Sequence, residues 1–347
     1  MESLQGRTLS SLAGEKNGFD TIRLLAACAV IFSHSFPLTG RHEPLMALTG
    51  QATLGDLAVA AFFLISGLLV SASFDRGSLA RYADRRLRRI MPGLVVSVAI
   101  SAFVFGSIFS SLPLGEFLVH PETLRFLGNA LFLPVGYDLP GVFLDHPMRA
   151  VNGSLWSLKY EMACYVFVPI ALAAARWRKP AVIAAWLASF AVAWAIPDGA
   201  RGAAYVLDLG AGLFRFYGTG MLLYLFADRV VIRRDWAWYA LALMIAAAFT
   251  PLFEEVAATA GAYAMVSFAY LCGKRFRKLT AKGDISYGVY VYAFPIQQMF
   301  VPLSLTFALP WLGNALLALP LAAFAGLLSW LVVERPALKY GRKPSPR

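Results

Sequence analysis

The sequence predicts an all-α fold, a polytopic membrane bundle of about ten transmembrane helices with both termini in the cytoplasm. Of its 347 residues, 59% are hydrophobic and 15% are charged, and the mean hydropathy is +0.63. This composition is too apolar for a soluble domain of this length. Apolar runs of roughly 17 to 25 residues, long enough to cross a bilayer as helices, recur along the chain. We therefore expect the lipid bilayer to be the main surrounding of the protein.

The apolar runs give ten candidate spans. They lie at about 19–38, 52–73, 90–111, 154–175, 181–197, 203–226, 236–250, 253–272, 284–307 and 309–333. A shorter apolar stretch, Leu124 to Val135, favours a re-entrant or interfacial element over a full span. The first 18 residues lack the short apolar core and cleavage site of a signal peptide, so the first run is expected to remain as a span.

The basic residues predict how the spans are oriented. With the amino terminus inside, 24 of the 31 lysines and arginines fall in inner segments and four in outer ones. Cytoplasmic loops carry such an excess of positive charge. The expected organisation is a cytoplasmic tail at 1–18, a transmembrane domain at 19–336 and a cytoplasmic basic tail at 337–347. Because topology explains the net charge of +11, we expect no nucleic-acid partner.

The longest connection between spans, residues 112–153, is predicted to lie outside. It carries His120, Asp138, Asp145 and His146 among prolines and glycines. A connection of this length can shape a binding surface, although a plain lid of exposed polar residues fits equally well. No internal repeat is visible, which argues against a transporter built from inverted halves.

Several small residues inside the spans are expected to serve in helix packing. Cys28, Cys164 and Cys272 have no spacing motif, so neither a disulfide nor a metal site is expected. Ser66 and Gly67, in the middle of the second span, permit close approach of another helix.

The first span keeps two polar residues that require an explanation. At about 100° per residue, Arg23 and His34 leave the helix on one face, roughly 16 Å apart along its axis. Burial favours the neutral imidazole, whose lone pair can accept a proton as a general base. A lone histidine in a bundle is as readily a satisfied hydrogen-bonding residue, but Arg23 on the same stripe favours a site.

The densest cluster of charge follows the second span, in RYADRRLRRIMP from Arg81 to Pro92. Arg86 and Arg89 share a helix face, as do Arg85 and Arg88. Paired guanidinium groups suit phosphate oxygens. An anchor on anionic lipid headgroups is the alternative, but six arginines between residues 76 and 89 exceed what topology requires.

Charged residues near the fourth and sixth spans suggest further polar positions. Glu161 can orient a neighbouring histidine or bind an acceptor hydroxyl, whereas Lys159 can extend to the outer surface. Trp156 lies at the predicted interface. Asp208 and Arg215 lie seven residues apart on one face, and mutual neutralisation is favoured over a catalytic role.

The ninth span opens with DISYGVYVY, where Ser286 and Tyr290 offer hydroxyl groups near the cytoplasmic side. The tenth ends in VVERP, with Glu334 and Pro336. Both stretches fit interface structure as well as a site.

Taken together, these stretches resemble the acyltransferase-3 family of bacterial integral membrane acyltransferases, which acylate cell-surface polysaccharides, nodulation factors and related molecules. Arg23, ten residues and His34 look like the signature of the family. FFLISGLL, RRLRRIMP, LWSLKYE, ISYGVY and VERP follow in family order, from Phe19 to Pro336. One departure is Ala293, where many members have a histidine, so a mechanism that needs two histidines is in doubt.

The resemblance implies that His34 is the essential catalytic histidine and Arg23 its partner, and we add Glu161 to this catalytic group. It associates Arg86 and Arg89 with the acyl donor, which we take to be acetyl-CoA. We expect the donor phosphates to be held by the arginine cluster of Arg85, Arg86, Arg88 and Arg89, and substrate to contact Trp156, Ser286 and Tyr290.

The expected enzyme is an O-acetyltransferase of the bacterial inner membrane, acting without a metal. It moves an acyl group, acetyl by family frequency, to a hydroxyl of a glycan or glycolipid acceptor at the periplasmic side. The alternative is a transporter of a sugar or lipid-linked solute, which gives no reason for the arginine cluster. A membrane sensor without enzymatic activity is less favoured.

Overall fold

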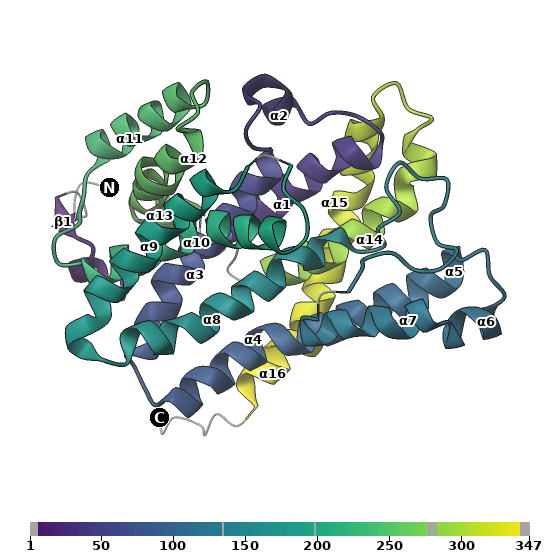
Figure 1. Ribbon diagram of the computed structural model, residues 1–347, viewed down its shortest axis with the longest axis horizontal. Coiled ribbons are helices and arrows are strands. Elements are labelled where there is room, and N and C mark those ends of the chain that lie inside the picture. Colours follow the sequence, from purple (N-terminus) through teal and green to yellow (C-terminus); the bar gives the residue numbers. More distant parts are fainter. Residues whose placement is uncertain (1–5, 134, 198, 277–279, 281–282, 341–347) are drawn as a thin grey trace. The chain divides into compact units, whose positions relative to one another are not determined.

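The computed structural model describes residues 6–133, 135–197, 199–276, 280 and 283–340 (Figure 1). Their regular secondary structure is helical apart from one pair of two-residue strands, which confirms the all-α prediction. Residues 341–347 of the predicted basic tail, and 1–5 of the predicted amino-terminal tail, lie outside the described residues.

The chain forms two compact units. The first comprises Met1–Ala26, Pro44–Leu79 and Tyr160–Lys282, and the second comprises Ala27–Glu43, Ala80–Lys159 and Gly283–Arg347. One boundary falls inside the first long helix and another inside the helix that carries Glu161.

A helix occupies each of the ten predicted spans. They are α1 (Phe19–Leu38), α3 (Leu54–Phe74), α4 (Leu79–Ile100), α8 (Leu158–Leu172), α9 (Arg178–Ala195), α10 (Ala203–Leu225), α11 (Arg234–Ala247), α13 (Ala262–Phe276), α14 (Ser286–Ser304) and α15 (Pro310–Ser329). Shorter elements are α2 (Pro44–Thr49), α6 (Leu114–Val119), α7 (Pro121–Phe126), η4 (Leu127–Leu131), η5 (Gly153–Ser157), α12 (Phe253–Val256) and η7 (Ala257–Gly261).

Within the described residues, six helical stretches are long and apolar enough to cross a membrane. They are Phe19–Leu38, Leu54–Phe74, Leu79–Phe109, Gly153–Leu172, Phe253–Gly273 and Pro310–Lys339. The protein is therefore a multi-pass membrane protein. Because α9, α10, α11 and α14 do not meet the same standard, the count of ten spans and the orientation of the termini stay predictions.

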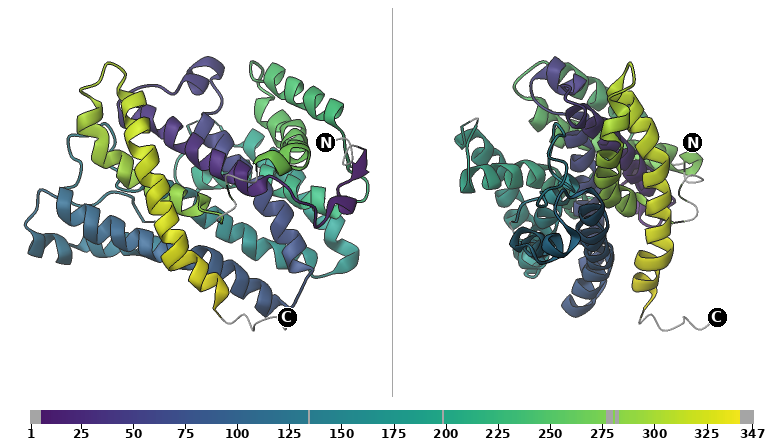
Figure 2. Two further views of the ribbon diagram at one scale, coloured as in Figure 1. Left: turned by 180° about the vertical axis from the view of Figure 1, so that it is seen from behind. Right: turned by 90° about the vertical axis from the view of Figure 1, so that its right-hand side faces the viewer.

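Two helices extend well beyond the apolar runs that predict them. Helix α4 of the third span begins at Leu79 rather than near residue 90 and continues through η3 (Ser101–Gly106) and α5 (Ser107–Phe109). The arginine cluster is therefore helical, as its predicted helix faces require. Helix α15 continues through η9 (Trp330–Glu334) and α16 (Arg335–Lys339) as one rod (Figure 2). Arginine and lysine are good helix formers, so a helix can continue where an apolar pattern stops.

In the first unit, α3 and α10 cross at unusually short range. A Cβ atom on Gly67 would lie 2.0 Å from the carbonyl oxygen of Tyr217, and one on Gly220 would lie 2.2 Å from that of Leu64. The absence of side chains at both glycines lets the two backbones touch. The prediction of Gly67 as a packing residue is confirmed.

The amino-terminal segment of the first unit is folded rather than a loose tail. Strand β1 (Arg7–Thr8) pairs antiparallel with β2 (Val231–Ile232). Leu9 and Leu12, in and beside the turn η2 (Ser10–Leu12), are buried in a core cluster that includes Val266 of α13. This apolar contact ties the segment to the unit.

One predicted pair in the first unit is wrong. Arg215 forms ion pairs with Glu254 at 3.0 Å and Glu255 at 3.5 Å, rather than being neutralised by Asp208. The two glutamates begin the helical stretch after α11, and their position in space was not visible in the helical spacing.

In the second unit, α14 packs closely on α15. A Cβ atom on Gly288 would lie 2.8 Å from the Cα atom of Gly326. Residues 114–131 form α6, α7 and η4, each too short to cross a bilayer, so Leu124 to Val135 does not form a full span, as predicted.

Candidate active site

Helix α1 carries both residues of the arginine and histidine signature. It is continuous from Phe19 to Leu38, so Arg23 and His34 share one helix as predicted. In the first unit, Arg23 forms an ion pair with Asp20 at 3.6 Å, one turn earlier. In the second unit, His34 is half-buried and meets the ring of Phe294 edge-on, with 5.2 Å between the ring centroids.

Phe294 of α14 links His34 to the segment that leads into α8. A Cβ atom on Gly153 would lie 2.7 Å from the Phe294 ring, so only glycine fits beside that ring. Four residues before Phe294, Tyr290 shares a hydrogen bond of 2.7 Å between its hydroxyl and that of Ser157. The LWSLKYE and ISYGVY motifs therefore meet directly.

The same segment is held by Asn152, whose side chain is fully buried. Its amide nitrogen donates to the carbonyl oxygen of Val291 at 2.9 Å and to the Ser101 hydroxyl at 3.2 Å. These bonds satisfy the amide nitrogen in a buried setting, where a donor without an acceptor is costly. They fix the backbone just before Gly153 against α4 and α14.

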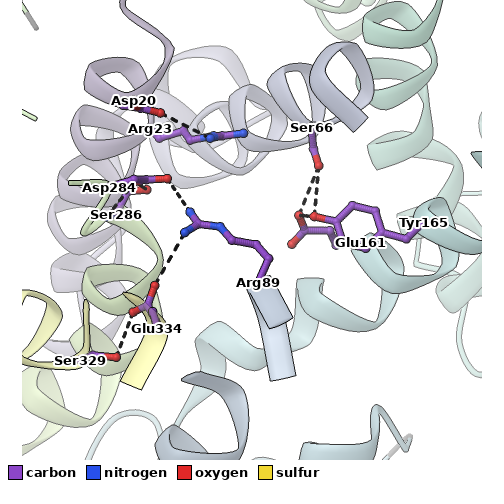
Figure 3. Close-up of polar contacts among 10 residues, drawn as sticks. All are labelled: Asp20, Arg23, Ser66, Arg89, Glu161, Tyr165, Asp284, Ser286, Ser329 and Glu334. Atoms are coloured by element: carbon purple, nitrogen blue, oxygen red, sulfur yellow. Dashed lines mark hydrogen bonds and ion pairs between the residues drawn. The ribbon is translucent and has the colours of Figure 1, made fainter. Parts of the chain in front are cut away.

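Two members of the arginine cluster on α4 have well-defined partners. Arg88 donates to Asp84 at 2.5 Å and to the carbonyl oxygens of Ala337 at 3.3 Å and Tyr340 at 2.9 Å. Arg89 donates to Asp284 and lies 3.8 Å from Glu334 (Figure 3). Arg88 and Arg89 thus hold the end of α16 and the start of α14 against α4.

The carboxylates around Arg89 have further partners. Asp284 accepts hydrogen bonds from the hydroxyl and the backbone N–H of Ser286, and Glu334 accepts one from Ser329 at 2.9 Å (Figure 3). Glu334 is only 1% exposed. The predicted substrate residue Ser286 therefore lies in the same polar network as the predicted donor residue Arg89.

An apolar cavity of about 440 Å³ borders this network in the second unit. It is lined by α4, η3, α14, α15 and η9, and its wall includes Ser329. Other lining side chains, such as Ile296, Phe324 and Leu328, are apolar. Low polarity around the ion pairs strengthens their electrostatic attraction.

Glu161 lies in the first unit, at the start of α8. Its carboxylate accepts a hydrogen bond of 2.6 Å from Tyr165 and one of 3.3 Å from Ser66 (Figure 3). Ser66 belongs to the small-residue pair on α3, so that motif also supplies a hydrogen-bond donor. The predicted catalytic residues are thus distributed over both units, with Arg23 and Glu161 in the first and His34 in the second.

Trp156 and the arginines Arg85 and Arg86 are half-buried in the second unit. Sequence reasoning missed Asp284 and Ser157 as partners. The only sign of either residue in the sequence was its position in a motif, since Asp284 is the first residue of DISYGVY and Ser157 lies within LWSLKYE. Among the described residues, no group of three or more His, Cys, Asp and Glu side chains could hold a metal ion.

Comparison with known proteins agrees with these motifs. The family model of the acyltransferase-3 family, described as an acyltransferase domain, matches residues 16–334. The chain is 30% identical to an O-acetyl transferase of Shigella phage Sf6, over 92% of this chain and 96% of the phage protein. It is 27% identical to nodulation protein 10 of Rhizobium leguminosarum bv. viciae, over 94% of each chain. No solved structure matches the chain.

The family match runs from residue 16 to Glu334 and so includes every motif described above apart from the last two residues of VERP. Such a match, with a relative that is aligned along nearly its whole length, identifies more than a shared membrane topology. The chain belongs to the acyltransferase-3 family of membrane O-acyltransferases.

Proposed function

We propose that the protein is an O-acetyltransferase of the bacterial inner membrane that transfers acetyl from cytoplasmic acetyl-CoA to a hydroxyl of a glycan or glycolipid at the periplasmic side. The single observation that carries the proposal is the similarity to the phage O-acetyl transferase along 92% of this chain. The helix that bears both Arg23 and His34 supports it, because a half-buried histidine is suited to general-base catalysis.

At the donor end, we assign the coenzyme A phosphates to the arginine cluster. Guanidinium forks bind phosphate oxygens with paired hydrogen bonds. The contacts of Arg88 and Arg89 with backbone carbonyls and carboxylates fix their side chains in place, which lowers the entropy that binding would cost. Arg85 and Arg86, half-buried on the same helix, complete the proposed donor site.

At the acceptor end, we assign His34 as the general base. Its imidazole takes the proton of the acceptor hydroxyl as that oxygen bonds to the acyl carbon. The carbon–sulfur bond breaks, and the proton passes to the leaving thiolate, so that the products are an ester and free coenzyme A. Arg23, on the same helix as His34, and Glu161 stay proposed catalytic residues, and Trp156, Ser286 and Tyr290 stay proposed substrate contacts.

The test is acetyl transfer by the purified protein in lipid nanodiscs, with radiolabelled acetyl-CoA and a glycan extract of the host. Wild type is compared with His34→Ala and with His42→Ala, which removes an exposed histidine just beyond α1. Loss of a general base typically costs about 10²- to 10⁴-fold in rate. We expect that loss for His34→Ala alone, with folding unchanged by circular dichroism.

Two outcomes would overturn the proposal in different ways. If His34→Ala transfers label as fast as wild type, His34 is not the base. If no extract accepts label from the wild type but a labelled sugar crosses the bilayer of protein-containing vesicles, the protein is a transporter instead.

A further inference from the structure

Residues 145–153, the last part of the outer connection, are hydrogen-bonded to Gln298 of α14. The side-chain amide of Gln298 donates to the carbonyl oxygens of Met148 at 2.8 Å and Ala150 at 2.7 Å. Its oxygen lies 2.9 Å from Nδ1 of His146. Gln298 is fully buried, so these bonds satisfy an amide that cannot reach water. The segment has a defined position on the second unit.

These contacts determine which nitrogen of His146 carries the proton. The two backbone carbonyls can only accept, so they fix the Gln298 amide nitrogen toward themselves and its oxygen toward the ring. An amide oxygen accepts, so Nδ1 of His146 donates. In the neutral ring Nε2 then holds a lone pair, and among the described residues it makes no hydrogen bond to protein. The ring stacks on Phe143, with centroids 4.6 Å apart, which limits its rotation.

His146 and His34 contact the same side of α14. The ring of His34 meets Phe294 and His146 meets Gln298. Residues four apart on a helix share a face and are separated by about 6 Å along the axis. The two histidines therefore approach α14 at levels one turn apart.

Apolar contacts confirm that this segment reaches the end of α1. Leu38, four residues after His34, forms a buried cluster with Phe294 and Val301, and Met148 and Ala150 of the segment pack against it. A Cβ atom on Gly40 would lie 3.7 Å from the Pro147 ring. Residues 145–153 therefore pack against the carboxyl end of α1, the helix that carries His34.

We propose that Nε2 of His146 binds a hydroxyl group of a saccharide acceptor beside His34. This inference rests on the proposed function. A neutral imidazole nitrogen with a lone pair is a hydrogen-bond acceptor, and a sugar hydroxyl is a matching neutral donor. Because Gln298 and Phe143 hold the ring, His146 has a fixed position from which to orient the acceptor, and His34 takes the proton of the reacting hydroxyl. Part of the outer connection is then a wall of the acceptor site.

The test separates this binding role from a merely structural one. His146→Asn places an amide nitrogen near the position of Nδ1, which can keep the hydrogen bond to Gln298, but it removes Nε2. The matched control is His120→Asn, because His120 caps α7 through Nδ1, which accepts from the backbone N–H of Glu122 at 3.3 Å, and asparagine also caps helices well. The acceptor KM and the acetyl-CoA KM are measured for both variants in nanodiscs.

Loss of one hydrogen bond corresponds to about a 5- to 10-fold change in affinity. We expect His146→Asn to raise the acceptor KM by about that factor and to leave the acetyl-CoA KM unchanged. His120→Asn should change neither. An acceptor KM like that of wild type in His146→Asn would overturn the inference while leaving the acetyltransferase intact. If the wild type transfers no acetyl at all, the proposed function fails first.

Discussion

Arg89 of α4 and Asp284, which lies just before α14, form a hydrogen-bonded ion pair across 195 residues of sequence. Glu334 lies on the other side of the guanidinium at 3.8 Å. The RRLRRIMP, ISYGVY and VERP motifs therefore meet at one charged cluster inside the second unit. The side chains are only 21% exposed for Arg89, 12% for Asp284 and 1% for Glu334, so water screens this cluster weakly.

We predict that each of the two carboxylates stabilises the protein. Asp284→Asn or Glu334→Gln alone removes one of these two carboxylates from Arg89 and should lower the free energy of unfolding by about 1–3 kcal/mol. The double variant removes both of these carboxylates from a largely buried cation and should lower the free energy of unfolding by about 3–5 kcal/mol relative to wild type. The measurement is the apparent melting temperature in detergent, by intrinsic fluorescence.

The control for these variants is Asp84→Asn. Asp84 pairs with Arg88 on the same helix, but its side chain is 53% exposed, so the change should stay within about 0.5 kcal/mol. If the Asp284 and Glu334 variants have the same apparent melting temperature as Asp84→Asn, the buried cluster does not stabilise the second unit.

A second prediction concerns the crossing of α3 and α10. Gly67→Ala places a Cβ atom 2.0 Å from the Tyr217 carbonyl oxygen, and because backbone cannot rotate away, the helices must separate. We expect a loss of about 2–4 kcal/mol, as for other overpacked or strained cores. Thermal unfolding of the purified variant measures it.

The matched substitution is Gly115→Ala in α6, where nothing lies within 4 Å of the added atom. Alanine favours a helix over glycine by up to about 1 kcal/mol, so this variant should be as stable as wild type or slightly more stable. Equal melting temperatures for Gly67→Ala and wild type would mean that the two helices do not touch as described.

The sequence predicted where helices lie far better than where they begin. Helix α1 was predicted from Phe19 to Leu38 and has those bounds, because its apolar run is flanked by polar and turn-forming residues. The third span was predicted to begin near residue 90, whereas its helix begins at Leu79, since charged residues interrupt the apolar pattern and still favour a helix. Apolar runs report burial in lipid or protein, whereas the helical backbone continues beyond them.

The sequence predicted which residues belong to most of the candidate site, but it did not predict which of them contact each other. Arg23 and His34 follow from helical spacing on one element. Asp284 as the partner of Arg89, and Ser157 as the partner of Tyr290, depend on which helices pack together, and one sequence contains no signal for that. Arg215 is an instructive error, because its nearest partner along its own helix, Asp208, was preferred to Glu254 on another element.

A third prediction tests the donor end of the proposed mechanism. Arg86→Ala should raise the KM for acetyl-CoA by about 10- to 100-fold, as loss of a charge-assisted hydrogen bond implies, and leave the acceptor KM unchanged. Arg86→Lys keeps the charge without the planar fork and should fall between wild type and Arg86→Ala. Steady-state rates in nanodiscs at two salt concentrations measure both constants.

The control is Arg81→Ala, which removes an exposed arginine from the same helix. If the arginine cluster only anchors the protein to anionic headgroups, both alanine variants should lose activity only in nanodiscs that contain anionic lipid. In neutral lipid, neither variant should then change the KM for acetyl-CoA. If the arginine cluster binds the donor phosphates, Arg86→Ala keeps its raised KM for acetyl-CoA in neutral lipid and Arg81→Ala has the KM of wild type. Added salt should then raise the KM for acetyl-CoA more in the wild type than in Arg86→Ala. That difference arises because the variant has one fewer charged contact for salt to screen.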